Sequence, residues 1–144
     1  MRLYGRFLTS GTVRVLDTNV LVRLITRDND AQVEIAEALL LEGPFLLLPS
    51  VLIEMVWVAS SRYAMPRGKI ATELRKLLGM ANAVIVSSSA VAWALTRFAD
   101  GADFADMLHF ALAEELEATS FATFDKRIKP HQVEGSSLRL ERLA

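Results

Sequence analysis

The chain of 144 residues contains no cysteine. Disulfide bonds, a thiolate nucleophile and cysteine-ligated zinc are therefore excluded. An excess of charge of one sign is also missing, because 16 Lys and Arg residues nearly balance 17 Asp and Glu residues and leave a formal net charge of −1. This balance excludes a strongly basic nucleic-acid-binding protein, so any contact with nucleic acid must use a local basic patch.

Long hydrophobic runs are absent as well. The most apolar stretch, residues 45–59, is interrupted by Pro49 and Glu54 and is too short to cross a bilayer. The start of the chain has neither the apolar core nor the small-residue cleavage site of a secretory signal. We therefore expect a cytoplasmic protein, with an irregular N-terminal extension at residues 1–12 and a single domain at residues 13–144.

Hydrophobic residues are nevertheless abundant. They make up 52% of the chain, which is a high share for a soluble monomer of this length. Such an excess predicts a surface for self-association or an apolar groove for a partner.

Short apolar runs alternate along the chain with segments of helical spacing. We expect strands at residues 13–16, 45–48, 84–86 and 119–123, and a short last one at 137–140. We expect helices from residue 20 onward, from Asp28 or Asp30 to the stop at Gly43-Pro44, at 51–62, at 67–78, from Ser88 or Ser89 to 98, and from Asp103 to 117. This alternation predicts a helix-rich, three-layer α/β/α sandwich with a short central parallel sheet.

Asp17 is the first anomaly, because it interrupts the apolar run at residues 13–22. A buried carboxylate without a partner costs several kcal/mol, so it is usually paired, protonated or bound to a metal. Its place after a predicted strand and before a helix is at the carboxyl end of the strand, where open α/β sheets bind ligands. The alternative is that Asp17 only caps the helix. Because the other acids favour a ligand role for Asp17, we assign the helix cap to Thr18 or Asn19.

Glu54 is the second anomaly. It is the only charged residue at positions 51–59, in a helix that is expected to be buried nearly all round and to be capped by Ser50. The alternative is a carboxylate that only interacts with the helix dipole.

Three more acids occupy comparable places. Asp103 and Asp106 are three residues apart and hence on one face of a first helical turn. Their alternative is a capping-box variant, which explains Asp103 better than Asp106. Asp125 follows the predicted strand 119–123, and its alternative is an ordinary turn aspartate.

Two of these acids follow strands, and two are expected in the first turns of helices at the same sheet edge. We therefore expect Asp17, Glu54, Asp106 and Asp125 to converge on one pocket. Clustered carboxylates without a dedicated Lys or Arg partner raise each other's pKa and require a cation. Ligands that are all oxygen favour Mg²⁺ or Mn²⁺. One or two such ions could activate a water and stabilise the displacement at a phosphodiester.

With these residues in place, the chain resembles the PIN-domain nuclease family, and within it the VapC-type toxins of prokaryotic toxin–antitoxin pairs. The resemblance runs from about residue 13 to about residue 129. It is carried by Leu-Asp-Thr-Asn-Val-Leu at 16–21, by Glu54 in its apolar helix, by Asp-Phe-Ala-Asp at 103–106 and by Thr-Phe-Asp at 123–125.

The resemblance implies a PIN-like fold and a metal-dependent endoribonuclease that cuts RNA. Asp17, Glu54, Asp106 and Asp125 match the family's catalytic, metal-binding acids, and Asp103 is an accessory ligand or only the cap. Side chains that orient the acids and water would be those of Thr18 or Asn19, and of Thr123. The resemblance also implies a homodimer and a cognate antitoxin protein, which lays a helix and an extended tail over the groove and often places an arginine at the acids.

Two other functions are alternatives to a nuclease. A catalytically inactive PIN module that only binds a protein partner is one alternative. A haloacid-dehalogenase-like phosphatase is the other, but that chemistry needs an aspartate two residues after Asp17, where Asn19 stands.

The remaining candidate residues are assigned plainer roles. We do not expect His109 or His131 to act directly, since magnesium sites seldom use imidazole. Trp57 and Trp93 are expected in the core or at an interface. Several basic residues could bind phosphates beside the acids, although each is by default a solvated surface charge. They are Arg23, Arg27, Arg62, Arg67, Lys69, Lys126, Arg127 and Lys129.

Overall fold

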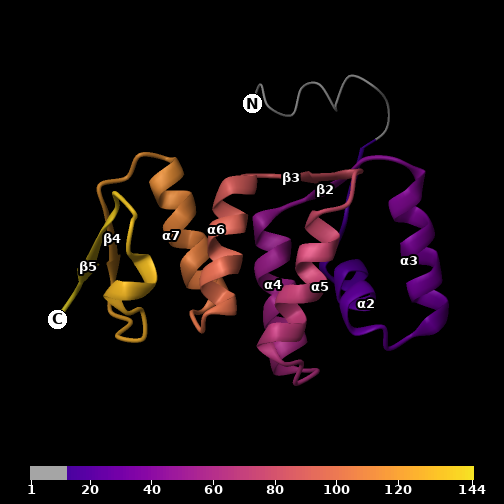
Figure 1. Ribbon diagram of the computed structural model, residues 1–144, viewed down its shortest axis with the longest axis horizontal. Helices are drawn as coiled ribbons and strands as arrows, with labels where there is room; N and C mark the ends of the chain where they lie inside the picture. The colour runs from indigo at the N-terminus through magenta and orange to yellow at the C-terminus, as the bar shows by residue number, and fades with distance from the viewer. Residues whose placement is uncertain (1–12) are drawn as a thin grey trace. The chain divides into compact units, whose positions relative to one another are not determined.

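The computed structural model describes residues 13–144, so the predicted N-terminal extension lies outside the described residues. The chain divides between residues 86 and 87 into two compact units. Both units combine helices with short parallel strands (Figure 1). The predicted fold class, a helix-rich α/β protein with a short parallel sheet, is confirmed.

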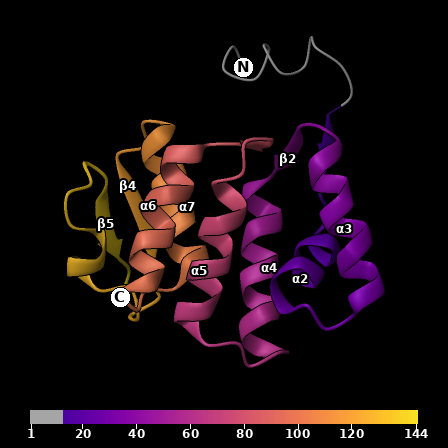
Figure 2. The same ribbon diagram turned by 45° about the vertical axis from the view of Figure 1, so that its right-hand side comes forward.

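The first unit contains a sheet of three parallel strands in the order β1-β2-β3. In this sheet Arg14 is paired with Phe45, and Phe45 with Ala83. Helices connect the strands, and α2 packs against both α3 and α4 (Figures 1 and 2). The elements are β1 (Arg14–Val15), α2 (Thr18–Thr26), α3 (Asp30–Glu42), β2 (Phe45–Leu47), α4 (Pro49–Ser61), α5 (Arg67–Leu78) and β3 (Ala83–Ile85).

The core of the first unit is built on the middle strand. Phe45 and Leu47 of β2 are buried, as the apolar run predicts for a strand covered on both faces. Helix α4 contributes one buried stripe, Leu52, Met55, Val56 and Ala59, at the spacing of a single helix face. The prediction that this helix is buried nearly all round is therefore wrong.

Strand β1 differs from the prediction of a buried strand at residues 13–16. It lies at the edge of the three-stranded sheet, so Val15 is 54% exposed and only Leu16, just beyond the strand, is buried. Arg14 points outward and forms an ion pair with Glu42 at the end of α3. The apolar run is therefore the edge of the sheet and not its centre.

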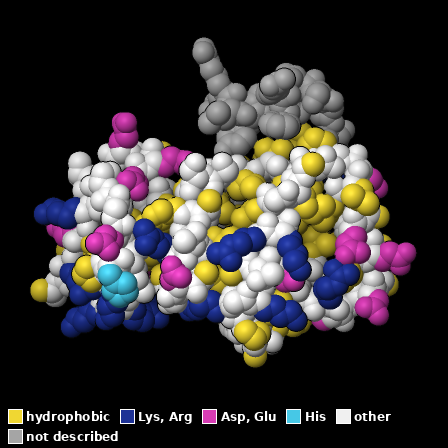
Figure 3. Space-filling view, viewed as in Figure 1, with side chains coloured by type: hydrophobic (Ala, Val, Ile, Leu, Met, Phe, Trp, Pro, Cys, Tyr) yellow, Lys and Arg dark blue, Asp and Glu magenta, His cyan; other side chains and the backbone are white. Residues whose placement is uncertain are grey.

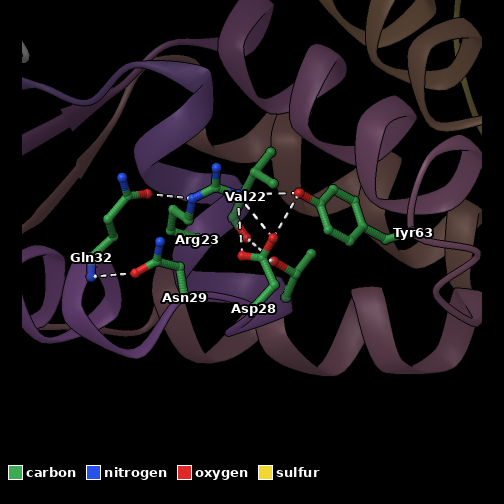
Figure 4. Close-up of polar contacts among 7 residues, drawn as sticks. Val22, Arg23, Asp28, Asn29, Gln32 and Tyr63 are labelled. Carbon is green, nitrogen blue, oxygen red and sulfur yellow. Dashed lines mark hydrogen bonds and ion pairs between the residues drawn. The ribbon is translucent and has the colours of Figure 1, made fainter.

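A network of hydrogen bonds links the connection between α2 and α3 to Tyr63, which lies just after α4 (Figure 4). Arg23 donates to both carboxylate oxygens of Asp28 at 3.1 Å and to the Tyr63 hydroxyl. Tyr63 in turn donates to Asp28 at 2.9 Å. The hydrogen bond from Tyr63 is the main cause that lowers the pKa of Asp28 below its ordinary value. Arg23, predicted as a possible phosphate contact, therefore has partners within the fold.

The second unit is built from two packed helices and a pair of strands. The aromatic rings of Trp93 and Phe110 are stacked across α6 and α7, and Phe121 of β4 lies against Phe110. Strands β4 and β5 are parallel, with Thr123 paired with Arg142. The elements are α6 (Ser88–Ala99), α7 (Phe104–Glu115), β4 (Ser120–Thr123), the 3-10 helix η1 (Pro130–Val133) and β5 (Arg139–Arg142).

Several helix starts differ from the predicted caps. Asn29 caps α3, with its side chain accepting from the backbone N–H of Gln32, in place of Asp28 or Asp30. Leu48 is the N-cap of α4, because Pro49 fits the first helical position without a backbone donor, and Ser50 lies inside the helix. Ser87, not Ser88 or Ser89, precedes α6. Among residues 13–144 no helix has the length and apolarity needed to span a membrane.

Candidate functional site: acidic side chains in each unit

Asp17 lies where the sequence predicts it, separated from the end of β1 by one residue and immediately before α2. It is, however, exposed, and its Oδ1 accepts a hydrogen bond from the backbone N–H of Thr18 at 2.8 Å. Its backbone is extended, and its carbonyl accepts from Val20 and Leu21, so Asp17 is the N-cap of α2. The assignment of the cap to Thr18 or Asn19 is therefore wrong. Asp17 avoids the cost of burial because it stands beyond the end of the strand.

Thr18 connects α2 to Glu54. Its side chain is buried, and its Oγ1 donates to Glu54 Oε2 at 2.9 Å. Glu54 itself is exposed and lies beyond the first turn of α4, because that helix begins at Pro49 rather than at Val51. In the first unit, Thr18 thus holds one carboxylate while its own backbone N–H holds the other, that of Asp17. The predicted orienting role of Asn19, which is exposed, stays a prediction.

Thr18→Val should separate the hydroxyl from the shape of the side chain. Loss of the hydrogen bond to Glu54 is expected to lower the free energy of unfolding by about 1 kcal/mol. If Glu54 ligates a divalent ion, Mn²⁺ affinity should also fall, by roughly 10-fold. Urea unfolding and isothermal titration measure these effects. Thr72→Val is the control, because the Thr72 hydroxyl donates a hydrogen bond within its own helix, to the backbone oxygen of Gly68. Equal unfolding midpoints and Mn²⁺ affinities in the two variants would contradict this role of Thr18.

Asp103 and Asp106 begin α7 in the second unit. Asp103 is exposed and caps the helix, with its Oδ1 accepting from the backbone N–H of Asp106 at 2.8 Å. Asp106 stands in the first helical turn and is half-buried. The structure therefore shows Asp103 as a cap, and a further role as accessory ligand stays a prediction.

Asp125 follows β4, as the sequence predicts. Its backbone N–H donates to Thr123 Oγ1 at 2.9 Å, and its Oδ1 accepts from the backbone N–H of Arg127 at 2.8 Å. The Arg127 guanidinium also binds the carboxylate through Nε, at 3.0 Å to Oδ1 and 3.1 Å to Oδ2, and through Nη2, at 2.7 Å to Oδ2. The expectation that the acids have no dedicated Lys or Arg partner is therefore wrong for Asp125.

Charge couples the acids of the second unit. Burial, and then the negative charges of Asp103 and Asp125, raise the pKa of Asp106, whereas Arg127 and His109 lower it. The hydrogen bonds from the side chain and backbone of Arg127 lower the pKa of Asp125 to about 2. Asp106 and Asp125, which the sequence can only place separately, are therefore close enough to interact.

The acidic side chains suit a divalent cation in their chemistry. Their donors are oxygen atoms, which Mg²⁺ and Mn²⁺ prefer, and the repulsion at Asp106 is the kind that a cation relieves. Within the described residues, however, no three Asp, Glu or His side chains form a group that could hold an ion. The convergence of all four acids on one pocket stays a prediction.

The histidine and tryptophan candidates differ in their exposure to solvent. His109 is exposed on α7 and His131 is exposed in η1. Trp57 is 58% exposed, so it is not a core residue. Arg97 lies over the ring of Trp93, which is half-buried.

Among the basic residues, Arg27 is paired with Glu37, as Arg23 is with Asp28 and Arg127 with Asp125. The Lys129 ammonium donates to the backbone oxygen of Lys126. The structural role of Arg127 was missed from the sequence. An aspartate two residues before an arginine, just after a strand, is the signal that could have found it.

Comparison with known proteins gives one family. The PIN domain family model matches residues 14–132, which is most of the chain and includes every acid described above. No curated protein matches the chain.

Proposed function

Because this chain belongs to the PIN domain family, we propose that it is a metal-dependent endoribonuclease. PIN domains are generally metal-dependent nucleases that use Mg²⁺ or Mn²⁺. We propose Asp17, Glu54, Asp106 and Asp125 as its metal ligands and catalytic acids. The divalent ion, when bound, supplies a nucleophilic water and charge stabilisation at the phosphate.

One observation carries the proposal. In each unit, an aspartate that follows a strand is linked to an acid on a helix. Thr18 links Asp17 and Glu54 by hydrogen bonds to both, and direct charge interaction links Asp125 and Asp106. Structural capping explains Asp17 and Asp103, but it explains neither Glu54 nor the half-buried Asp106.

The chain's own residues have definable tasks in this proposal. Thr18 orients Glu54 through its buried hydroxyl. The Thr123 hydroxyl fixes the start of the loop that carries Asp125. Both are contacts of the kind that hold metal-binding carboxylates in one orientation.

Cleavage of a defined substrate tests the proposal. The purified chain is incubated with a 5′-labelled RNA that contains a single-stranded loop, with Mg²⁺, with Mn²⁺ or with EDTA. We expect RNA cleavage that requires the metal. A DNA strand of the same sequence is the substrate control. Intact RNA together with a silent Mn²⁺ titration of the folded chain would contradict the proposal and favour an inactive, protein-binding PIN module.

A finer proposal is that the nuclease is a VapC-type toxin that acts on cytoplasmic RNA, forms a homodimer and is neutralised by an antitoxin. An apolar groove of about 420 Å³ in the first unit supports a protein partner, and Figure 3 shows hydrophobic side chains exposed between α3 and α5. Leu41, at this groove, is 77% exposed. Burial of such a surface would explain the apolar excess of the composition.

Induced expression tests the toxin role. We expect growth arrest that is relieved when the neighbouring gene product is co-expressed. Sequencing of RNA 5′ ends after induction would identify the target and the cut position. If growth is unimpaired although the purified chain cleaves RNA, the nuclease proposal stands and the toxin proposal is wrong.

A further inference from the structure

The Asp125–Arg127 contact has the geometry of a competitor for a cation. Arg127 reaches both oxygens of the carboxylate, at 3.0 and 3.1 Å from Nε and at 2.7 Å from Nη2. This fork is the arrangement in which arginine binds a carboxylate most firmly. A divalent cation that coordinates Asp125 would have to share or replace these contacts.

The Arg127 guanidinium can also be replaced by another cation at Asp125. The Arg127 side chain is 86% exposed, whereas that of Asp125 is 22% exposed. Water screens an exposed ion pair, so its net contribution to stability is small. The backbone N–H of Arg127 and the Thr123 hydroxyl hold the Asp125 loop independently of the guanidinium. The guanidinium can therefore leave without loss of the turn.

The charge of Arg127 acts on more than one acid. It interacts electrostatically with Asp106 and Asp103 in addition to its hydrogen bonds with Asp125. Its positive charge thereby offsets part of the repulsion among the acids of the second unit, as a bound cation would.

We infer that Arg127 is a built-in counter-ion which competes with the divalent metal for Asp125 and sets the metal affinity of the enzyme. This inference rests on the proposed function, in which Asp125 is a metal ligand. Without metal, the guanidinium holds Asp125. When the metal binds, the guanidinium is displaced into solvent.

Isothermal titration of the full chain with Mn²⁺ tests the inference through four proteins. Arg127→Ala is expected to bind Mn²⁺ roughly 2- to 5-fold more tightly than the wild type, the gain that corresponds to losing an exposed ion pair. Lys126→Ala removes a neighbouring exposed charge and should change the affinity less than about 2-fold. Arg127→Lys keeps the charge but not the fork, so it should resemble Arg127→Ala.

A spectroscopic readout separates displacement from a merely structural role. In ¹H–¹⁵N spectra, the Nε–H signal of Arg127, assigned by its loss in Arg127→Lys, should shift when Mg²⁺ is added. The same ionic strength of NaCl should leave it unchanged. A fixed signal under saturating Mg²⁺ would show that the fork persists, which overturns the inference.

The titrations distinguish failure of the Arg127 inference from failure of the proposed nuclease function. Equal or weaker Mn²⁺ binding by Arg127→Ala, in a wild type that binds Mn²⁺ and cleaves RNA, overturns the inference and leaves the proposed function intact. Equal gains in Arg127→Ala and Lys126→Ala also overturn it, because general charge would then suffice. Silent titrations of all four proteins overturn it too, and the RNA assay then decides the proposed function separately.

Discussion

Asp17→Asn is expected to reduce metal-dependent RNA cleavage by more than about 100-fold, since loss of a group that merely supports a metal ligand already costs about 10- to 100-fold. The fold should remain intact. Asp17 is also the N-cap of α2, and Asn is about as good an N-cap as Asp. The substitution therefore removes the negative charge while it keeps the hydrogen bond to Thr18.

Asp17→Ala is the comparison that exposes the second role of this residue. It removes the cap together with the charge, and should lower the free energy of unfolding by about 0.5–2 kcal/mol. Cleavage rates and urea unfolding of the two variants are measured in parallel. If Asp17→Asn still cleaves RNA in a metal-dependent way, the proposed mechanism is wrong. If it unfolds as readily as Asp17→Ala, the loss of activity has a structural cause.

Asp106→Asn is expected to abolish cleavage and to stabilise the protein. Half-burial and the charges of Asp103 and Asp125 raise the pKa of Asp106, so its ionised form disfavours the folded state. After a discount for solvent screening, removal of the charge should add up to about 1 kcal/mol to the free energy of unfolding. That corresponds to a rise in Tm of roughly 1–4 °C.

The sign of the pH dependence follows from linkage. A carboxyl whose pKa is raised on folding binds its proton more tightly in the folded than in the unfolded state, so it destabilises the fold above the raised pKa. Below the ordinary pKa of aspartate, both states are protonated and the effect vanishes. The extra stability of Asp106→Asn should therefore be full at neutral pH, begin to decline as the pH falls to the raised pKa, and vanish below the ordinary pKa of aspartate.

Thermal unfolding between pH 3 and pH 8 measures this difference. Asp100→Asn is the matched control, because Asp100 is an exposed aspartate at the end of α6 in the same unit. A lower Tm for Asp106→Asn at neutral pH would show that Asp106 stabilises the fold, and would remove the argument that its carboxylate is kept for function.

Much of the architecture could be read from the sequence because local patterns decide it. Helix α5 occupies residues 67–78 as predicted, since its apolar residues recur at helical spacing and Gly79 ends it. Asp103 caps α7 as proposed, because its side chain needs only a backbone N–H three residues away. The four acids likewise lie on the elements that the sequence predicts for them. Asp17 and Asp125 come after strands, and Glu54 and Asp106 lie in helices.

Local patterns failed where a distant element decides burial or pairing. The run at residues 13–16 has the composition of a buried strand, but strand order makes β1 an edge, and Val15 is exposed. The apolar composition of α4 suggests burial all round, but the packing of α2 and α5 against it covers only part of its surface.

The sequence by itself determined the fold class, the order of the elements and the acids with their oxygen chemistry, because these depend on residue type and on short-range spacing. Only the tertiary structure decided that the Thr18 hydroxyl holds Glu54 and that Asp106 and Asp125 interact. Such contacts depend on side-chain direction and on packing between elements far apart in the chain, which spacing along a sequence does not encode.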